Sequence, residues 1–286
     1  MNFQDLSKRF ISSIISLALL ACVLIFSYVG IVKWLIALLT AGIGALGIWE
    51  YCRLGKLSEK KGLTELCMAV GAMTVLAFFI SSFDRSLSLL PFILVFFGLI
   101  CLFLYHFDKI SGAIGSIAMS LFGIVYVAVP LGLILKILYL FSPCKMGHEG
   151  RVWLLYLLVV TKITDVGAYF GGRLFGNKKL AANLSPGKTI TGAIFGFCSA
   201  IIFSILFYFV GRMIPNFYLS QFESIWLGAL LGFLGQVGDL GESLFKRDAA
   251  VKDSNRLPGL GGILDMLDSL LFTTPVIYFF LYICKG

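Results

Sequence analysis

Long apolar runs constrain the fold of this 286-residue chain more than any other feature. A helix needs about 20 apolar residues to cross a hydrocarbon layer of roughly 30 Å. Nine stretches meet this requirement, at residues 10–30, 31–49, 66–83, 87–105, 113–141, 152–170, 190–211, 224–241 and 268–284. The pattern predicts an all-α polytopic integral membrane protein with about nine transmembrane helices. Pro130 and Gly132 are expected to kink the long fifth run.

Composition excludes several other classes of protein. Hydrophobic residues make up 59% of the chain and charged residues 13%, whereas soluble domains are roughly half apolar and about a quarter charged. A soluble enzyme or a disordered scaffold is therefore a poor interpretation. The seven Cys residues are scattered with no CxxC pair, so neither a disulfide framework nor a zinc site is indicated. The two His residues, His106 and His148, both fall in short loops, which argues against His-based acid–base chemistry.

The positive charges indicate an orientation in the membrane. If the N-terminus is cytoplasmic and nine helices follow, fifteen Lys and Arg residues fall in cytoplasmic segments and six in external ones. Cytoplasmic loops of membrane proteins carry such an excess, so we expect a cytoplasmic N-terminus and an external C-terminus. The formal charge of +8 then reflects contact with anionic lipid headgroups rather than with nucleic acid.

The first apolar run has two interpretations. Lys8 and Arg9 precede it, as in a secretory signal peptide, and residues 19–22 (LLAC) weakly resemble a lipoprotein cleavage site. However, the run has no polar exit and leads directly into the second run. We favour an uncleaved signal-anchor helix, with a cleaved signal peptide as the alternative.

Polar residues are concentrated in the second half of the chain. We divide it into an N-terminal membrane-spanning region of about five helices, residues 1–150, and a C-terminal catalytic region of about four helices, residues 151–286. The cytoplasmic loops of the second region are expected at residues 171–189 and 242–267. Residues 239–268 alone hold six of the fifteen carboxylates. Charges at the ends of membrane spans are costly and are usually functional.

Two carboxylate patterns indicate metal binding. One helical face collects two acids, a hydroxyl and a cation at i, i+3, i+4 and i+7, namely Asp239, Glu242, Ser243 and Lys246. Asp265 and Asp268 are neighbours on a turn that follows a glycine-rich segment. Carboxylate oxygens suit Mg²⁺, which often binds through one or two carboxylates plus substrate phosphates. The alternative is a helix N-terminus whose positive dipole end attracts acids.

A basic segment is typical of an anion site. Residues 171–179 (GGRLFGNKK) offer flexible backbone and cations, and residues 185–189 (SPGKT) open the next span. Backbone N–H groups at a helix N-terminus, with Lys and hydroxyl groups, bind phosphate well. The segment lacks the Walker A spacing, and a plain basic loop with a helix cap is the alternative. Together with the carboxylates, it indicates metal-assisted phosphoryl or nucleotidyl transfer at the membrane face.

These motifs closely resemble those of the phosphatidate cytidylyltransferase (CDP-diacylglycerol synthase) family. Residues 238–253 (GDLGESLFKRDAAVKD) match G-D-x-x-E-S and S-x-x-K-R-x4-K-D, and residues 258–268 (PGLGGILDMLD) follow P-G-H-G-G-x-x-D-R-x-D. Upstream, residues 165–176 (DVGAYFGGRLFG) and 185–189 match D-x-G-A-Y-x-x-G-R-x-F-G and S-P-x-K-T. The motif-bearing resemblance covers roughly residues 161–275.

The match has two departures and a spacer that is one residue short. Leu260 stands where the family motif has His, and Met266 stands where it has Arg. The spacer between Asp253 and Pro258 is shorter by one residue. Any phosphate contact that the missing side chains provide must come from elsewhere, and Arg256 is one candidate.

The resemblance implies CMP transfer from CTP to phosphatidic acid, giving CDP-diacylglycerol and pyrophosphate, at the cytoplasmic face of the inner membrane. It implies Mg²⁺ held by Asp239, Asp265 and Glu242. A second group is expected to act in catalysis with Asp239 and Asp265: Ser243, Lys246, Lys252 and Asp268. A third group is expected to bind substrate: Asp165, Arg173, Lys179, Ser185, Lys188, Thr189 and Arg247.

Two alternatives remain open at this point. Leu260 and Met266 are compatible with a catalytically impaired homologue that binds nucleotide or lipid. A transporter is less favoured, because Lys136 and Lys162 are the main candidates for the ionisable groups that a transporter places near mid-span, and no inverted repeat is visible. We expect Lys162 to reach the cytoplasmic side or to pair with Asp165. The sequence leaves open the acyl-chain preference, a homodimer, and a monovalent cation such as K⁺ beside Mg²⁺.

Overall fold

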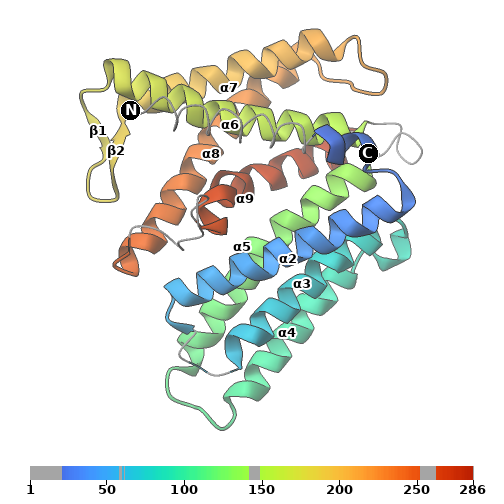
Figure 1. The fold of residues 1–286 in the computed structure, drawn as a ribbon, viewed down its shortest axis with the longest axis vertical. Helices are drawn as coiled ribbons and strands as arrows, with labels where there is room; N and C mark the ends of the chain where they lie inside the picture. The colour runs from blue at the N-terminus through green and yellow to red at the C-terminus, as the bar shows by residue number, and fades with distance from the viewer. Residues whose placement is uncertain (1–20, 58–59, 61, 142–148, 252–261, 286) are drawn as a thin grey trace, which may run out of the picture.

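The computed structural model describes residues 21–57, 60, 62–141, 149–251 and 262–285. Within these ranges, eight helices are long and apolar enough to cross a membrane. Figure 1 shows them as α2 (Gly30–Leu54), α3 (Leu63–Ser81), α4 (Leu90–His106), α5 (Ala113–Tyr139), α6 (Gly150–Phe175), α7 (Ile190–Gly211), α8 (Gln221–Asp248) and α9 (Ile263–Phe280). Two short turns lie next to these helices: the 3₁₀ turn η2 (Arg85–Leu87) precedes α4, and the π-helical turn η3 (Leu281–Lys285) follows α9.

The predicted all-α polytopic fold is confirmed. Every predicted span from residue 31 onward has its helix, although individual ends differ by up to seven residues, as at the end of α8. The first half of the first predicted span, residues 10–20, lies outside the described residues. In the described half, residues 21–26 are helical. The signal-anchor and signal-peptide interpretations therefore both remain untested. Helix α5 continues through Pro130 as one element.

Large apolar side chains cover the outside of the helices. In α4, Phe92, Phe96 and Phe103 are each at least half exposed, and this helix buries few residues. Such a surface would be unfavourable in water, but lipid tails satisfy it, while the helices satisfy their own backbone groups. The exposed faces are therefore the lipid-facing surface.

Figure 1 shows how the two halves of the chain meet. Helices α2, α3, α4 and α5 pack together, α6 lies alongside α7, and α8 crosses beneath them. Helix α9 contacts α8 and α6 on one side and α5 and α2 on the other. The predicted division between residues 1–150 and 151–286 coincides with the start of α6 at Gly150, and its existence as a domain boundary stays a prediction.

Buried hydroxyl groups join the helices of the second half. The Tyr156 hydroxyl of α6 lies 2.6 Å from the Ser204 hydroxyl of α7, which donates to the Ser224 carbonyl of α8 at 2.5 Å. Thr161 of α6 donates to Thr273 of α9 at 3.1 Å. Because lipid offers no competing partners, such bonds between helices contribute to association within a membrane. They fix the positions of the four helices that carry the polar motifs.

A β-hairpin between α6 and α7 was not predicted. Strand β1 (Lys179–Ala181) pairs antiparallel with β2 (Ser185–Thr189), with Lys179 opposite Thr189 and Ala181 opposite Ser185. We expected a basic loop here, because the segment is short, polar and without strand-like alternation. The hairpin projects beyond the ends of α6 and α7 (Figure 1). It places the residues of the SPGKT segment on a defined strand.

Candidate active site

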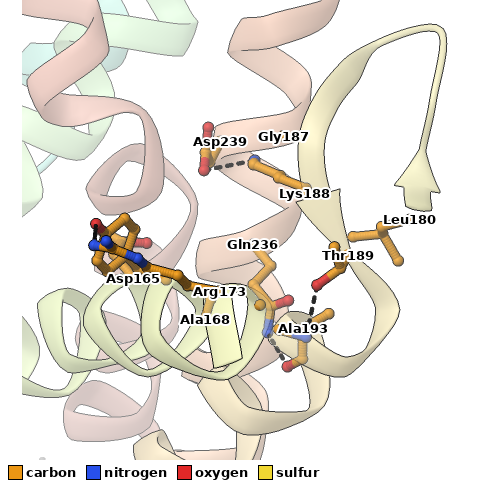
Figure 2. A pocket seen from close by; sticks show the side chains of 13 residues that line it. Asp165, Ala168, Arg173, Leu180, Gly187, Lys188, Thr189, Ala193, Gln236 and Asp239 are labelled. Atoms are coloured by element: carbon orange, nitrogen blue, oxygen red, sulfur yellow. Dashed lines mark hydrogen bonds and ion pairs between the residues drawn. The ribbon is translucent and has the colours of Figure 1, made fainter. Parts of the chain in front are cut away.

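A cavity of about 330 Å³ lies where the end of α6, the hairpin, the start of α7 and the middle of α8 meet (Figure 2). Its polar and charged lining residues come from α6, the hairpin and α8: Asp165, Tyr169, Arg173, Lys188, Thr189, Gln236 and Asp239. Five of these seven are residues that the sequence predicted for substrate or metal binding. Asp165 and Asp239, which are 74 residues apart in the sequence, thus line the same cavity.

Lys188 of the hairpin points toward Asp239 of α8. The Lys188 ammonium forms an ion pair with the Asp239 carboxylate at 2.5 Å, as Figure 2 shows. Both side chains are about one-third exposed or less, so the pair is only partly solvated. Thr189 then caps α7, because its hydroxyl accepts a hydrogen bond from the Gly192 N–H at 3.1 Å. The cap fixes the strand-to-helix transition that carries Lys188.

Helix α7 starts very close to α6. A Cβ at Gly192 would lie 2.6 Å from the Ala168 carbonyl oxygen, and real side chains do not approach so closely. Glycine is therefore required at this position for the two helices to pack as they do. The close approach brings the Thr189 cap against the face of α6 that lines the cavity.

Three polar residues of α6 follow one another along the cavity at intervals of four residues. Arg173 donates a hydrogen bond to the Tyr169 hydroxyl at 2.9 Å, and Asp165 lies one turn before Tyr169. Lys162 forms an ion pair with Asp165 at 3.7 Å, which confirms the predicted i, i+3 pairing. This face of α6 therefore presents Arg173 and the Lys162–Asp165 pair beside Asp239.

A second charged cluster joins α8 to α9. The Lys246 ammonium forms ion pairs with Glu242, one turn earlier on α8, and with Asp265 of α9 at 2.6 Å. The Asp265 carboxylate also accepts a hydrogen bond from the Gly262 N–H at 3.1 Å. Asp265 thus stabilises the N-terminus of α9, which was the alternative to a metal-binding role for this acid. It also binds Lys246.

Asp268 of α9 lies beside the first group of charged residues. Its side chain is buried against α8, where Gly238 leaves room for the α9 backbone: a Cβ there would lie 2.5 Å from the Asp268 carbonyl oxygen. Asp268 lies close enough to Asp239, Asp165 and Lys162 for their charges to interact. The carboxylates of three helices are therefore gathered within one region, and each lowers the energy of a nearby cation.

Several predicted residues are not among those that line the cavity. Lys179 and Ser185 are on the hairpin, and neither lines the cavity. Arg247 donates to the Leu184 carbonyl at 3.0 Å, which ties the end of α8 to the hairpin turn. Ser243 is buried on α8. Lys252, Asp253, Arg256 and Leu260 lie outside the described residues.

Sequence reasoning missed Glu50 of α2. Its side chain is 1% exposed, and its two carboxylate oxygens accept hydrogen bonds from the N–H groups of Ile263 at 3.0 Å and Leu264 at 2.9 Å. These are the first two amides of α9, the helix that carries Asp265 and Asp268. The available signal was an acid directly after the predicted span 31–49, because charges at the ends of membrane spans are usually functional.

Met266 has a cation beside it. The Lys162 ammonium donates to the Met266 carbonyl oxygen at 3.3 Å, and the Met266 side chain is about half exposed. Met266 is the position at which the family motif has Arg. Lys162, from α6, therefore supplies a positive charge at the place where the motif residue is missing.

The donor chemistry of the site fits a divalent cation bound jointly with substrate. Among the described residues, no group of three or more His, Cys, Asp or Glu side chains is placed to hold a metal ion by itself. Instead, Asp239 faces Lys188, while Glu242 and Asp265 face Lys246. Mg²⁺ typically uses one or two carboxylates and takes its other ligands from water and phosphate, so a complete protein cage is not required.

The fold and site define a class: a polytopic membrane protein with a polar cavity of facing cations and carboxylates at one end of its helices. The chain belongs to the cytidylyltransferase family, whose model matches residues 7–284. It is 35% identical to the phosphatidate cytidylyltransferase of Chlamydia trachomatis serovar D over 99% of this chain and 95% of that protein.

Two further relatives carry the same name. The phosphatidate cytidylyltransferase of Chlamydia pneumoniae is 35% identical over 99% of this chain and 94% of its own length. The phosphatidate cytidylyltransferase of Staphylococcus aureus strain COL is 44% identical over 45% of this chain and 48% of its own length. The resemblance found in the motifs is therefore confirmed, and it extends through the N-terminal half.

Proposed function

We propose that this protein transfers CMP from CTP to phosphatidic acid, which yields CDP-diacylglycerol and pyrophosphate for phospholipid synthesis. The observation that carries the proposal is the cavity that Arg173, Lys188 and Asp239 line together, in which Lys188 forms an ion pair with Asp239. The relatives that match almost the whole chain are named phosphatidate cytidylyltransferase. A nucleoside triphosphate is a polyanion, and cations in a partly enclosed cavity bind it favourably.

In this reaction an oxygen of the lipid phosphate bonds to the α-phosphorus of CTP. The bond from that phosphorus to the oxygen bridging to the β-phosphate breaks, and its electron pair leaves with pyrophosphate. The attacking phosphate is already anionic at neutral pH, so no strong general base is needed. His106, the one His among the described residues, accordingly lies away from the cavity, hydrogen-bonded to the Leu102 carbonyl at 2.8 Å.

The main barrier is the approach of two anions and the growth of charge on the leaving pyrophosphate. Lys188 and Arg173 reach the cavity from opposite walls, and both are placed to bind phosphate oxygens. The Thr189 hydroxyl and the first turn of α7 add a helix N-terminus to the same wall. These groups hold the nucleotide phosphates, while Lys162 lies beside α9 on the side of Asp268.

We propose Mg²⁺ as the cofactor. Asp239 is the first candidate ligand because its carboxylate lines the cavity, and Asp265 and Glu242 are the further candidates from α9 and α8. When bound, the ion would neutralise negative charge on the phosphates and on the leaving pyrophosphate. Lys188 and Lys246 neutralise the same carboxylates in the ligand-free protein.

The direct test uses purified full-length protein in mixed micelles that contain phosphatidic acid and CTP labelled at the α-phosphate. We expect Mg²⁺-dependent transfer of label into the lipid fraction, abolished by EDTA and restored by excess Mg²⁺. The Asp239→Asn variant should lose activity by about 10²-fold, the usual effect of removing one group that stabilises the transition state. Asp108→Asn, an exposed carboxylate outside the cavity, is the matched control and should retain activity.

Two outcomes would contradict the proposal. Binding of CTP or lipid without any transfer would favour the impaired homologue that Leu260 and Met266 allow. Transfer that persists at full rate in EDTA would remove Mg²⁺ from the mechanism.

We also propose that the cavity faces the cytoplasm, where CTP is available. The supporting observation is the excess of Lys and Arg at the same end of the helices. C-terminal fusions test this orientation in a bacterial host. We expect alkaline phosphatase to be active and green fluorescent protein to be dark, and the reverse result would contradict the proposed topology.

A further inference from the structure

A second cavity, of about 660 Å³, lies at the other end of the helices from the candidate active site. It is bordered by the end of α3, η2, the start of α4, the second half of α5, the end of α9 and η3. Tyr282, which lines it, is 17 residues after Asp265. At 1.5 Å per residue this separation is roughly 25 Å, most of the thickness of a bilayer core.

A nearly buried lysine points to an anionic ligand. Lys136, in the last turn of α5, is 6% exposed and lines this cavity. Its ammonium lies 5.8 Å from the centre of the Phe78 ring, and no ion pair joins it to any described residue. A buried ammonium without a neighbouring anion is unfavourable, because it loses the stabilisation that water gives a charge. An anion bound in the cavity would remove that penalty.

Arg85 provides a second cation at the same cavity. It lies in η2, outside the end of α3, so it is positioned at the level of a lipid headgroup. The neighbouring Asp84 carboxylate accepts hydrogen bonds from the N–H and hydroxyl of Ser86, at 2.9 and 2.8 Å, and does not line the cavity. No carboxylate is among the described lining residues. The charged side chains among these lining residues are therefore both positive.

The remaining walls are apolar and open to the membrane. Phe92 of α4 and Phe279 of α9 line the cavity and are 62% and 55% exposed. Tyr278 and Tyr282 add two aromatic rings with polar tips, the residue type that is enriched at membrane interfaces. A small soluble anion would leave these walls uncovered, whereas acyl chains would cover them.

We propose that this cavity binds an anionic phospholipid from the leaflet opposite the active site. The headgroup phosphate binds between Lys136 and Arg85, and the acyl chains lie along α4 and α9. Two cations and no acid give the charge complementarity, and the exposed aromatic walls give the lipid its apolar contact. This site is separate from the one at which the proposed reaction takes place.

Native mass spectrometry of the full-length protein, released from nanodiscs, tests the proposal. The nanodiscs contain equal amounts of phosphatidylglycerol and phosphatidylcholine, and CTP is left out so that the result is independent of catalysis. We expect wild-type protein to retain phosphatidylglycerol preferentially. The Lys136→Met/Arg85→Gln double variant should lose that preference by about 30-fold, since two cations near a headgroup, at about 1 kcal/mol each, contribute about 2 kcal/mol.

The matched control is Lys33→Met. Lys33 belongs to α2, lies 4.7 Å from the centre of the Phe83 ring and does not line the cavity. It should leave lipid retention unchanged. Arg85→Gln alone alters only an exposed side chain, so it keeps the test valid if the double variant does not fold, and we expect a several-fold loss.

Three results would overturn the proposal. These are equal retention of the two lipids by wild-type protein, unchanged retention by both cation variants, and an equal loss in Lys33→Met. A change from dimer to monomer in the Arg85→Gln variant without loss of lipid would instead identify the face as an interface between copies of this chain.

Discussion

The carboxylate of Glu50, in the N-terminal half, accepts a hydrogen bond from the N–H of Ile263 at the start of α9, 213 residues away. Its other oxygen accepts from Leu264 at 2.9 Å. An acid at a helix N-terminus satisfies free amides and interacts favourably with the helix dipole. The helix that carries Asp265 and Asp268 is therefore capped by a residue from the other half of the protein.

We predict that Glu50→Ala lowers both stability and turnover. Two buried amides lose their acceptors, which destabilises the protein by about 1–3 kcal/mol per unsatisfied group. Glu50→Gln keeps one acceptor oxygen and should fall between wild type and Glu50→Ala. Thermal unfolding in detergent and the transfer of labelled CMP measure the two effects. Because Asp265 and Asp268 move with α9, we expect the Mg²⁺ concentration for half-maximal activity to rise as well.

Glu65→Gln is the control for this prediction, since Glu65 is an exposed acid in the first turn of α3. It should match wild type in all three measurements. A Glu50→Ala protein with reduced stability but an unchanged Mg²⁺ requirement would show that Glu50 is structural and does not position the site.

We predict that Asp265→Asn remains folded and inserted but loses at least about 10²-fold in turnover. The substitution removes the charge that faces Lys246, while the amide oxygen can still accept from the Gly262 N–H. Size-exclusion profiles establish folding, and the labelled-CTP assay measures turnover. Near-normal turnover in this variant would eliminate Asp265 as a metal ligand.

Lys188→Gln should weaken CTP binding more than it slows the chemical step. The lysine lines the cavity and is free to bind phosphate once its pairing with Asp239 is exchanged, so we expect KM for CTP to rise by about tenfold. Steady-state kinetics with CTP as the varied substrate provide the measurement. Lys178→Gln is the control, because Lys178 precedes the hairpin and does not line the cavity. Equal effects of the two substitutions would indicate loss of general basic charge rather than of a specific contact.

Lys162 is expected to compensate for the arginine missing at Met266. Lys162→Met should lower kcat/KM by about tenfold or more, because it removes the cation beside Met266 and leaves Asp165 unpaired. Lys162→Arg should retain most activity. The double variant Lys162→Met/Met266→Arg should recover part of the loss, measured as kcat/KM for phosphatidic acid. Failure of the added arginine to restore any activity would refute compensation.

Much of the fold followed from local pattern. Each apolar run from residue 31 onward is a helix because the requirement for about 20 apolar residues acts on one segment at a time. The pairing of Lys162 with Asp165 followed from helical spacing, and so did the position of Glu242 and Lys246 on one face of α8. The Thr189 cap of α7 is equally local, since a hydroxyl before a helix binds an amide of its first turn.

The contacts that join separate helices did not follow from the sequence. Lys188 with Asp239, Lys246 with Asp265, and Glu50 with the first amides of α9 depend on how the helices are arranged. The hairpin, too, forms where α6 ends and α7 begins, and its sequence alone predicted a loop. The sequence by itself determined which segments enter the membrane and which residue types the site contains, because hydrophobicity and helical spacing are properties of neighbouring residues. Only the tertiary structure decided which charge faces which, because partners in different helices are selected by packing, which no single segment encodes.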